Sequence, residues 1–253
     1  MKFLHLQVTL FCSLVALNAN PIEVEQEYGD KFQGDIVLTP EQEVETTHVG
    51  RVGRTGTINT NVRWPKINGR VTVPYVIDSV YSSSEKNLIY NAMNEISSKT
   101  CVSFVPRSSQ NDYIRFFSGD GCWSYIGRIG GKQDLSLKRS GCMVHGIAMH
   151  EIIHALGYGH MHQHYQRDSK VRINYGNIQS GLEVWFKTLD PASWNNYGTS
   201  YDVSSVMHYG PYSFSRNGQM TIQAYSSADQ RVMGQRSYLS SGDVARIKNM
   251  YAC

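Results

Sequence analysis

The sequence predicts an α+β protein in which loops make up a large share of the chain. Segments that read as strands alternate with segments whose apolar residues recur at helical spacing. The 16 tyrosines and 22 glycines favour strands and loops over a mostly helical interior. With 41% hydrophobic and 18% charged residues, the 253-residue chain has the composition of a globular protein and suits one or two domains plus processed ends.

The first residues have the pattern of a secretory signal, which we assign to residues 1–19. Lys2 supplies the positive start, residues 8–17 are mostly apolar, and Ala19 is a small residue before a cut near Asn20. The apolar run is too short to span a membrane, and no later stretch is long enough. We therefore expect a secreted, extracellular protein with no membrane segment; the alternative is a retained N-terminal helix.

Residues 20–54 are interpreted as a propeptide. They hold eight acidic and three basic residues, are poor in aromatic residues and are not expected to form a core. Arg51 and Arg54 would suit a trypsin-like activating protease, with the mature chain starting near Thr55. A flexible N-terminal tail is the alternative.

The next predicted elements are a strand, a helix and three short strands. Residues 71–77 read as a strand, and Pro74 places it at a sheet edge or a bulge. Ser84 can cap the helix that follows. Its helically spaced apolar residues are Leu88, Ile89, Ala92, Met93 and Ile96. The short strands are predicted at residues 101–106, 113–117 and 123–128.

A second helix is predicted to begin just before His150. After His160 the chain is rich in Tyr, Ser, Asn and Gly with little periodicity, so mainly irregular structure is expected. Ser240, with Asp243 three residues on, indicates the start of a last helix. Its apolar residues are Val244, Ile247 and Tyr251.

The cysteines predict two disulfides. Cys12 leaves with the signal, and an even number of cysteines remains in an expected secreted chain. Three pairings are possible, and spacing alone does not choose among Cys101, Cys122, Cys142 and Cys253. Use of these thiols as metal ligands would need close paired spacing, which they lack.

Residues 150–160 read His-Glu-Ile-Ile-His-Ala-Leu-Gly-Tyr-Gly-His and carry the strongest functional signal. On a helix, His150 and His154 project from one face, where two neutral imidazoles can bind one zinc ion. Glu151 lies beside the first histidine and can act as general base on a metal-bound water. The pattern therefore indicates a metal centre with a built-in base.

The residues after His154 add a third ligand and indicate a catalytic metal site. Gly157 can take the positive φ that ends the helix, and the turn brings His160 back as a third ligand. Three protein ligands plus water are typical of a catalytic zinc, not a structural one. The fixed offsets argue against a helix with incidental histidines. This long zincin motif predicts a methionine-bearing turn downstream, and Ser205–Gly210, Ser-Val-Met-His-Tyr-Gly, supplies one.

The zinc motif and the methionine turn resemble the astacin family of secreted zinc metalloendopeptidases, a branch of the metzincins. The resemblance covers nearly the whole chain after the signal. Family segments also match in order at Phe32–Asp35, Arg63–Pro65, Val73–Ile77, Lys99–Pro106 and Gly121–Arg128.

The resemblance implies roles for the site residues. Glu151 would be the catalytic base, and Tyr209 would join the metal sphere at rest and swing away to stabilise the tetrahedral intermediate. Met207 would form an apolar floor beneath the metal. The ligands of the single Zn²⁺ would be His150, His154 and His160.

The resemblance also implies a zymogen. Asp35 corresponds to the propeptide aspartate that binds zinc in place of the catalytic water, so the uncut form would be latent. Residues 55–253 would form the catalytic domain. The implied disulfides are Cys101–Cys253 and Cys122–Cys142.

The implied fold has two lobes around a cleft. The upper lobe would hold a twisted, mostly parallel five-stranded sheet with two helices, and the largely irregular lower lobe would end in the C-terminal helix. A protein or peptide substrate would lie extended along an edge strand, pairing with it through main-chain hydrogen bonds. The residues of that edge are Trp123, Ser124 and Tyr125. We expect a monomer.

The chain departs from the family pattern directly after the third ligand. The family usually has Glu, then Arg and Asp, where this chain has Met161, His164 and Gln166. The usual glutamate meets the buried amino terminus of the mature enzyme, which a thioether cannot do. His162 and His164 are expected to be solvent-facing or hydrogen-bonded, or else to lie behind the metal ligands; His145 and His208 are expected to be structural.

Three functions compete for this pattern. The leading one is an active zinc endopeptidase. A binding protein or toxin without turnover is disfavoured by the intact base, Glu151, and a zinc hydrolase of non-peptide substrates by the edge-strand segment. Despite a net charge of +3, the chain has no Lys/Arg run or basic helix, so nucleic-acid binding is not expected. Roles in digestion, hatching, venom and matrix turnover stay open.

Overall fold

The computed structural model describes residues 31–47, 60–189 and 195–253. The predicted signal, residues 1–19, and the processing region at Arg51, Arg54 and Thr55 lie outside the described residues. No helix in these three ranges combines the length and apolarity needed to cross a bilayer.

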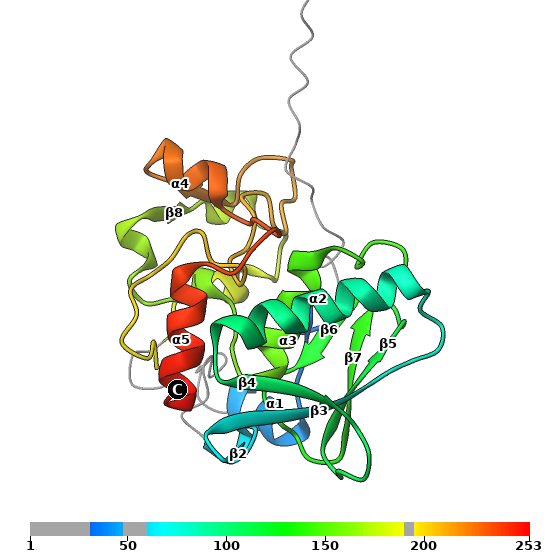
Figure 1. Cartoon of the computed structure of the whole chain (residues 1–253). Coiled ribbons are helices and arrows are strands. Elements are labelled where there is room, and N and C mark those ends of the chain that lie inside the picture. The colour runs from blue at the N-terminus through cyan, green and yellow to red at the C-terminus, as the bar shows by residue number, and fades with distance from the viewer. Residues whose placement is uncertain (1–30, 48–59, 190–194) are drawn as a thin grey trace, which may run out of the picture.

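The larger of the two sheets among the described residues has seven strands (Figure 1). Its order is β1-β6-β7-β5-β3-β2, with β4 paired to β3. The β1/β6, β3/β4, β3/β5 and β5/β7 pairs are parallel, and the β2/β3 and β6/β7 pairs are antiparallel. The strands are β1 (Ile36–Val37), β2 (Lys66–Ile67), β3 (Arg70–Ile77), β4 (Val102–Pro106), β5 (Tyr113–Phe117), β6 (Cys122–Tyr125) and β7 (Lys132–Leu137). The mostly parallel sheet of the prediction is therefore confirmed, with the two-residue strands β1 and β2 added to its five strands.

The prediction that Pro74 marks an edge or a bulge is wrong, because β3 has neighbours on both sides. Thr72 N donates to Pro65 O on the β2 side, and alternate residues point the same way, so the missing N–H of Pro74 also lies on that side. Pairing with β2 has ended there, and pairing with β5 begins at Tyr75. On that side of β3, Pro74 therefore lies between the end of the pairing with β2 and the start of the pairing with β5. Its missing N–H costs the sheet no hydrogen bond.

Two helices pack on this sheet and on each other. Helix α2 (Ser83–Lys99) contacts β4, and α3 (His145–Ala155) contacts α2, β6 and β7. The cap of α2 is Ser82, not Ser84: its side chain accepts from Glu85 N, and its own N–H donates to Glu85 Oε2 at 2.7 Å. The core face of α2 is as predicted and includes Ile89, Ala92, Met93 and Ile96.

The chain beyond His160 is mainly irregular, as predicted, but it contains elements that the sequence did not reveal. Strands β8 (Val171–Ile173) and β9 (Ile222–Ala224) form an antiparallel pair, and α4 (Ser227–Val232) is a short helix. The predicted last helix is α5 (Ser241–Tyr251), capped by Ser240 and Asp243. The short 3-10 helices in this part are η3 (Met161–Gln163), η4 (Arg167–Ser169), η5 (Tyr175–Asn177) and η6 (Glu183–Phe186), and a further one, η2 (Thr60–Val62), precedes β2.

Two disulfides tie these parts together. Cys101–Cys253 joins the start of β4 to the last residue, and Cys122–Cys142 joins β6 to the loop before α3. Both are the pairs that the family resemblance implies.

The N-terminal segment corrects one expectation. Residues 20–54 are not expected to form a core, yet Gln33, Asp35 and Ile36 are at most 1% exposed. The strand β1 lies within this segment, and α1 (Pro40–Thr47) follows it. The acidic composition of the whole segment hid this short buried stretch, because most of the acidic residues lie outside it.

Candidate active site

Helix α3 presents His150 and His154 one turn apart, and both are fully buried. The helix ends at Ala155 with Leu156 as its C-cap, and Gly157 takes a φ of +108°, which turns the chain toward His160. Gly146, near the start of α3, donates to Arg236 O at 3.0 Å, and a Cβ on it would lie 2.1 Å from the Arg236 backbone. The helix is therefore held against that backbone with no room for a side chain.

The three imidazoles converge on one carboxylate from the N-terminal segment. Asp35 Oδ2 lies 3.1 Å from His150 Nε2, 3.1 Å from His160 Nε2 and 3.7 Å from His154 Nε2. The four ligand atoms all lie within 4.8 Å of one another, and each residue is at most 1% exposed. The structure thus brings together the three histidines and the aspartate that the resemblance assigns to the metal.

The outer nitrogens fix how each ring is oriented. His150 Nδ1 lies 2.8 Å from Val206 O, and His154 Nδ1 lies 2.6 Å from Tyr158 O. A carbonyl only accepts, so each Nδ1 carries a proton, and in the neutral ring each Nε2 then carries a lone pair toward Asp35. His160 Nδ1 lies 2.8 Å from Gln33 Oε1.

This group fits a bound cation. Burial lowers the pKa of His150 well below its ordinary value and also lowers the pKa of His160, which favours neutral rings. Imidazole lone pairs and a carboxylate oxygen then face one another, and such acceptors repel unless a cation lies between them. Asp35 Oδ1 and His154 Nε2 have no hydrogen-bond partner among the described residues. Three nitrogens and one oxygen are ligands that Zn²⁺ prefers in four-coordinate sites.

The predicted catalytic and turn residues lie around the group. Glu151 is fully buried on α3, next to His150. The Tyr209 hydroxyl donates to Gln33 O at 2.7 Å, and its ring centre is 4.6 Å from that of His160. Met207 is buried, and its carbonyl accepts from Met161 N at 2.8 Å.

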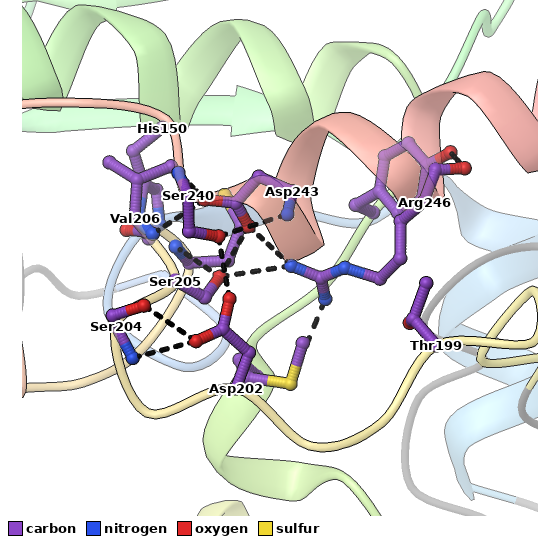
Figure 2. A network of polar contacts seen from close by, with 12 residues as sticks. His150, Thr199, Asp202, Ser204, Ser205, Val206, Ser240, Asp243 and Arg246 are labelled. Atoms are coloured by element: carbon purple, nitrogen blue, oxygen red, sulfur yellow. Dashed lines mark hydrogen bonds and ion pairs between the residues drawn. The ribbon is translucent and has the colours of Figure 1, made fainter. Parts of the chain in front are cut away.

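A buried polar network from α5 holds the methionine turn (Figure 2). Asp243 Oδ2 accepts from Val206 N at 2.9 Å, and Oδ1 accepts from Ser205 Oγ at 2.6 Å. Arg246 forms an ion pair with Asp243 and donates to Ser205 Oγ at 2.9 Å. Since Val206 O accepts from His150, α5 positions a metal-facing histidine through one residue, Val206. Sequence reasoning used Asp243 as a helix cap and did not foresee this role.

Among the residues that depart from the family pattern, Met161 and His164 are buried and Gln166 is exposed. Met161 lies with its Sδ 3.7 Å from Arg246 Nη1, so this thioether faces a cation already paired with Asp243. His162 and His164 are fully buried and hydrogen-bonded, not solvent-facing. His162 Nε2 donates to Trp185 O at 2.9 Å.

The predicted substrate edge is covered by the N-terminal segment. Strand β1 pairs parallel to β6, with Ile36 opposite Ser124 and Val37 opposite Tyr125. Ser124 N donates to Asp35 O at 2.9 Å. On its other edge, Trp123 pairs with Ser136 of β7. Without β1, the outer edge of β6 would have no strand beside it among the described residues.

Comparison with known proteins places this geometry in a family. The sequence model of the peptidase family described as Astacin matches residues 56–252. The chain is 37% identical over 228 residues to zinc metalloproteinase nas-4 of Caenorhabditis elegans, covering 89% of this chain and 70% of the relative. It is 40% identical over 192 residues to the low choriolytic enzyme of Oryzias latipes, covering 76% and 69%.

A solved structure agrees with the sequence comparisons. High choriolytic enzyme 1, a hatching enzyme zinc-protease from Oryzias latipes, superposes with a TM-score of 0.71 and 42% identity. The match covers 77% of this chain and 96% of that one. Myroilysin, at 19% identity and a TM-score of 0.54, shares the fold. Because the family model spans most of the chain, this protein belongs to the astacin family of zinc metalloproteinases.

Proposed function

We propose that this protein is a secreted zinc endopeptidase made as a latent zymogen, in which Asp35 blocks the metal site until the N-terminal segment is cut away. The observation that carries the proposal is the position of Asp35 Oδ2, 3.1 Å from both His150 Nε2 and His160 Nε2. A carboxylate at that place denies an attacking water its position. Protein or peptide substrates follow from the family.

The zinc would be held by His150, His154 and His160, and when bound it supplies a Lewis acid that polarises the scissile carbonyl and makes water acidic. Glu151 takes the proton from the attacking water and returns it to the leaving amine.

Tyr209 supplies a hydrogen-bond donor to the developing oxyanion. In the uncut chain its hydroxyl donates to Gln33 O, so the N-terminal segment occupies this donor as well as the metal site. Removal of the segment frees the hydroxyl for substrate. The segment therefore blocks two parts of the catalytic machinery at once.

The substrate lies extended against β6, at Trp123, Ser124 and Tyr125. Support comes from β1, which already pairs with this edge through Ser124 N and Asp35 O at 2.9 Å. A peptide that takes the place of β1 would pass directly by the histidine group. A trypsin-like protease acting at Arg51 or Arg54 would clear the cleft, and the active form is a monomer.

The test uses the full chain as secreted, before and after trypsin treatment, with an unstructured protein as substrate. Wild type is expected to be silent before treatment and active after it, and a chelator should remove the activity. Asp35→Ala should be more active than wild type before treatment, because the segment loses its contact with the metal site and leaves the cleft more often. A variant as silent as uncut wild type would refute the zymogen proposal.

Glu151→Gln is the matched test of the base. It keeps the side-chain size on α3 and removes the proton acceptor. Treated Glu151→Gln should lose about 10²–10⁴-fold in kcat while retaining zinc in a metal assay. Cleavage at the wild-type rate would rule out Glu151 as the base, and a processed wild type without any cleavage would favour a binding protein that has lost turnover.

A further inference from the structure

The side chain of Gln33, two residues before Asp35, is fully buried beside the histidine group. Its carboxamide makes two contacts: Oε1 lies 2.8 Å from His160 Nδ1, and Nε2 lies 3.0 Å from Gln163 Oε1. Gln33 takes a φ of +52°, a conformation that is uncommon outside glycine. The backbone is thus bent at the residue whose side chain enters this polar niche.

The orientation of each amide follows from its neighbour. Gln163 Nε2 donates to Trp185 O at 3.1 Å, so its Oε1 is the atom that faces Gln33. That oxygen only accepts, so Gln33 presents its NH₂ to Gln163 and its carbonyl oxygen to His160. His160 must then carry its proton on Nδ1, which leaves the Nε2 lone pair toward the metal position. A backbone carbonyl in η6 therefore sets the tautomer of His160 through two carboxamides.

His160 differs from His150 and His154 in where its Nδ1 partner lies in the chain. The Nδ1 partners of His150 and His154 are Val206 O and Tyr158 O, which stay with the catalytic domain after processing. The Nδ1 partner of His160 belongs to the N-terminal segment. Loss of that segment removes this hydrogen bond from His160 and one from Gln163.

We propose that His160 Nδ1 and Gln163 Oε1 form a carboxamide-binding subsite, which Gln33 fills and which strengthens self-inhibition beyond the Asp35 contact. The inference rests on the proposed latent form. A subsite with one donor and one acceptor selects a side chain with the complementary pair. Glutamate at position 33 would offer no donor to Gln163, and alanine would reach neither atom.

Full burial makes these two contacts matter. His160, Gln163 and Gln33 are each 0% exposed. Losing the carboxamide while the segment stays in place leaves a buried donor and a buried acceptor without partners, which is costly compared with the same loss in water. We call the form with the N-terminal segment in the cleft closed and the form with the segment released open. The closed form should therefore become about 10- to 100-fold less populated relative to the open form.

The experiment measures the open fraction in the full chain. Peptidase activity of the uncut protein is divided by the activity of the same sample after trypsin treatment. Processing removes residue 33, so the treated activity reports how much of each preparation is folded. Gln33→Ala and Gln33→Glu should each raise the ratio about tenfold or more over wild type, and Gln163→Ala should do the same.

A double-mutant cycle assigns the effect to the subsite. Gln33→Ala combined with Gln163→Ala should raise the ratio no further than Gln33→Ala alone, because Gln33→Ala already removes the contact to Gln163. The matched control is Gln42 on α1, whose Nε2 donates to Ile126 O at 3.3 Å, away from Gln163. The effects of Gln42→Ala and Gln163→Ala on the activity ratio should multiply in the double variant. A wild-type ratio in Gln33→Ala, or effects of Gln33→Ala and Gln163→Ala that multiply, overturns the subsite.

Two readouts separate this inference from the proposed function. If Asp35→Ala raises the ratio and Gln33→Ala does not, the subsite is wrong while the zymogen stands. If Asp35→Ala is silent, the zymogen proposal fails first, and proton NMR of the uncut chain still decides on the subsite. The Nδ1–H signal of His160 should exchange slowly in wild type and be lost in Gln33→Ala, with the signals of His150 and His154 kept. Retention of all three contradicts the subsite.

Discussion

At the scale of single residues, the site is held by partners that lie behind the metal-facing atoms. His150, His154 and His160 each bond through Nδ1 to a carbonyl oxygen, which fixes the ring and leaves Nε2 for the metal position. The partner of His150, Val206, is in turn held by Asp243. The motif therefore specifies the ligands, and residues far along the chain specify their orientation.

Asp243→Asn tests this support. The change keeps the shape but removes the charge that pairs with Arg246, whose side chain is 4% exposed. Leaving one buried ion without its partner should lower the free energy of unfolding by about 3–5 kcal/mol, measured by urea denaturation. Asp202→Asn is the control, because Asp202 bonds Ser204 and Ser240 and is not ion-paired to an arginine in this network. Equal losses from the two changes would contradict a special role for the Asp243–Arg246 pair.

At the scale of elements, Glu95 links three segments of the fold. From α2 it contacts His145, the first residue of α3, at 2.7 Å, and it accepts from Leu239 N, just before α5, at 3.0 Å. Burial would raise its pKa, but hydrogen bonds from Lys99, His145 and Leu239 outweigh it and lower the pKa to about 2. The carboxylate form of Glu95 thus holds the start of α3 and the chain before α5 against α2.

This depressed pKa predicts an acid-dependent loss of stability. A carboxyl with a folded pKa of about 2 and an ordinary value of 4.5 stabilises the fold fully above pH 4.5, and the contribution is lost as pH falls toward 2. After allowance for its 19% exposed side chain, we expect about 1–2 kcal/mol. Glu95→Gln should flatten stability against pH over that window. A Glu95→Gln variant that keeps the wild-type slope would contradict this role of the carboxylate.

The predictability of elements also varied for physical reasons. The start of helix α5 could be predicted because Ser240 and Asp243 form a capping box, which is a signal local in sequence. Strand β7 could not be predicted, because it buries the polar side chains of Gln133 and Ser136. These residues break the alternation of apolar and polar residues expected of a strand. The buried place of Gln33 could not be read either, since its partners are 127 and 130 residues away.

At the scale of the whole molecule, two closures hold distant parts of the chain together. One is the metal-binding group, which joins the N-terminal segment to α3 and the loop after it. The other is Cys101–Cys253, which spans 152 residues and fixes the end of α5 to β4. Each should contribute to global stability by restricting the unfolded chain or by binding only the folded one.

Replacing Cys101 and Cys253 together by serine should lower the free energy of unfolding by about 4–5 kcal/mol in the chain-entropy view. The reference is the Cys122–Cys142 pair, which encloses only 20 residues and should cost less when removed in the same way. Denaturation of both double variants under non-reducing conditions compares them. A larger loss from the shorter loop would show that loop closure is not the main contribution.

Metal removal should destabilise the uncut chain as a whole. At a zinc concentration about 100 times the Kd, binding contributes about 2.7 kcal/mol, so a chelator should lower Tm by roughly 5–10 °C. Added Zn²⁺ should restore the transition, and Mg²⁺ should not, because it prefers oxygen ligands. A Tm that ignores the chelator would speak against one metal ion bound by Asp35 and the three histidines.

The contact of Gly146 with the Arg236 backbone has a consequence for how this protein can vary. Any side chain at Gly146 must push α3 away from the loop as a rigid rod, since a Cβ there would come within 2.1 Å of that backbone. His150 and His154 would then travel as a pair while His160, beyond the turn, stayed behind. A single methyl group at Gly146, which is not one of the metal-facing residues, could in this way alter the spacing of the three histidines without replacing any of them.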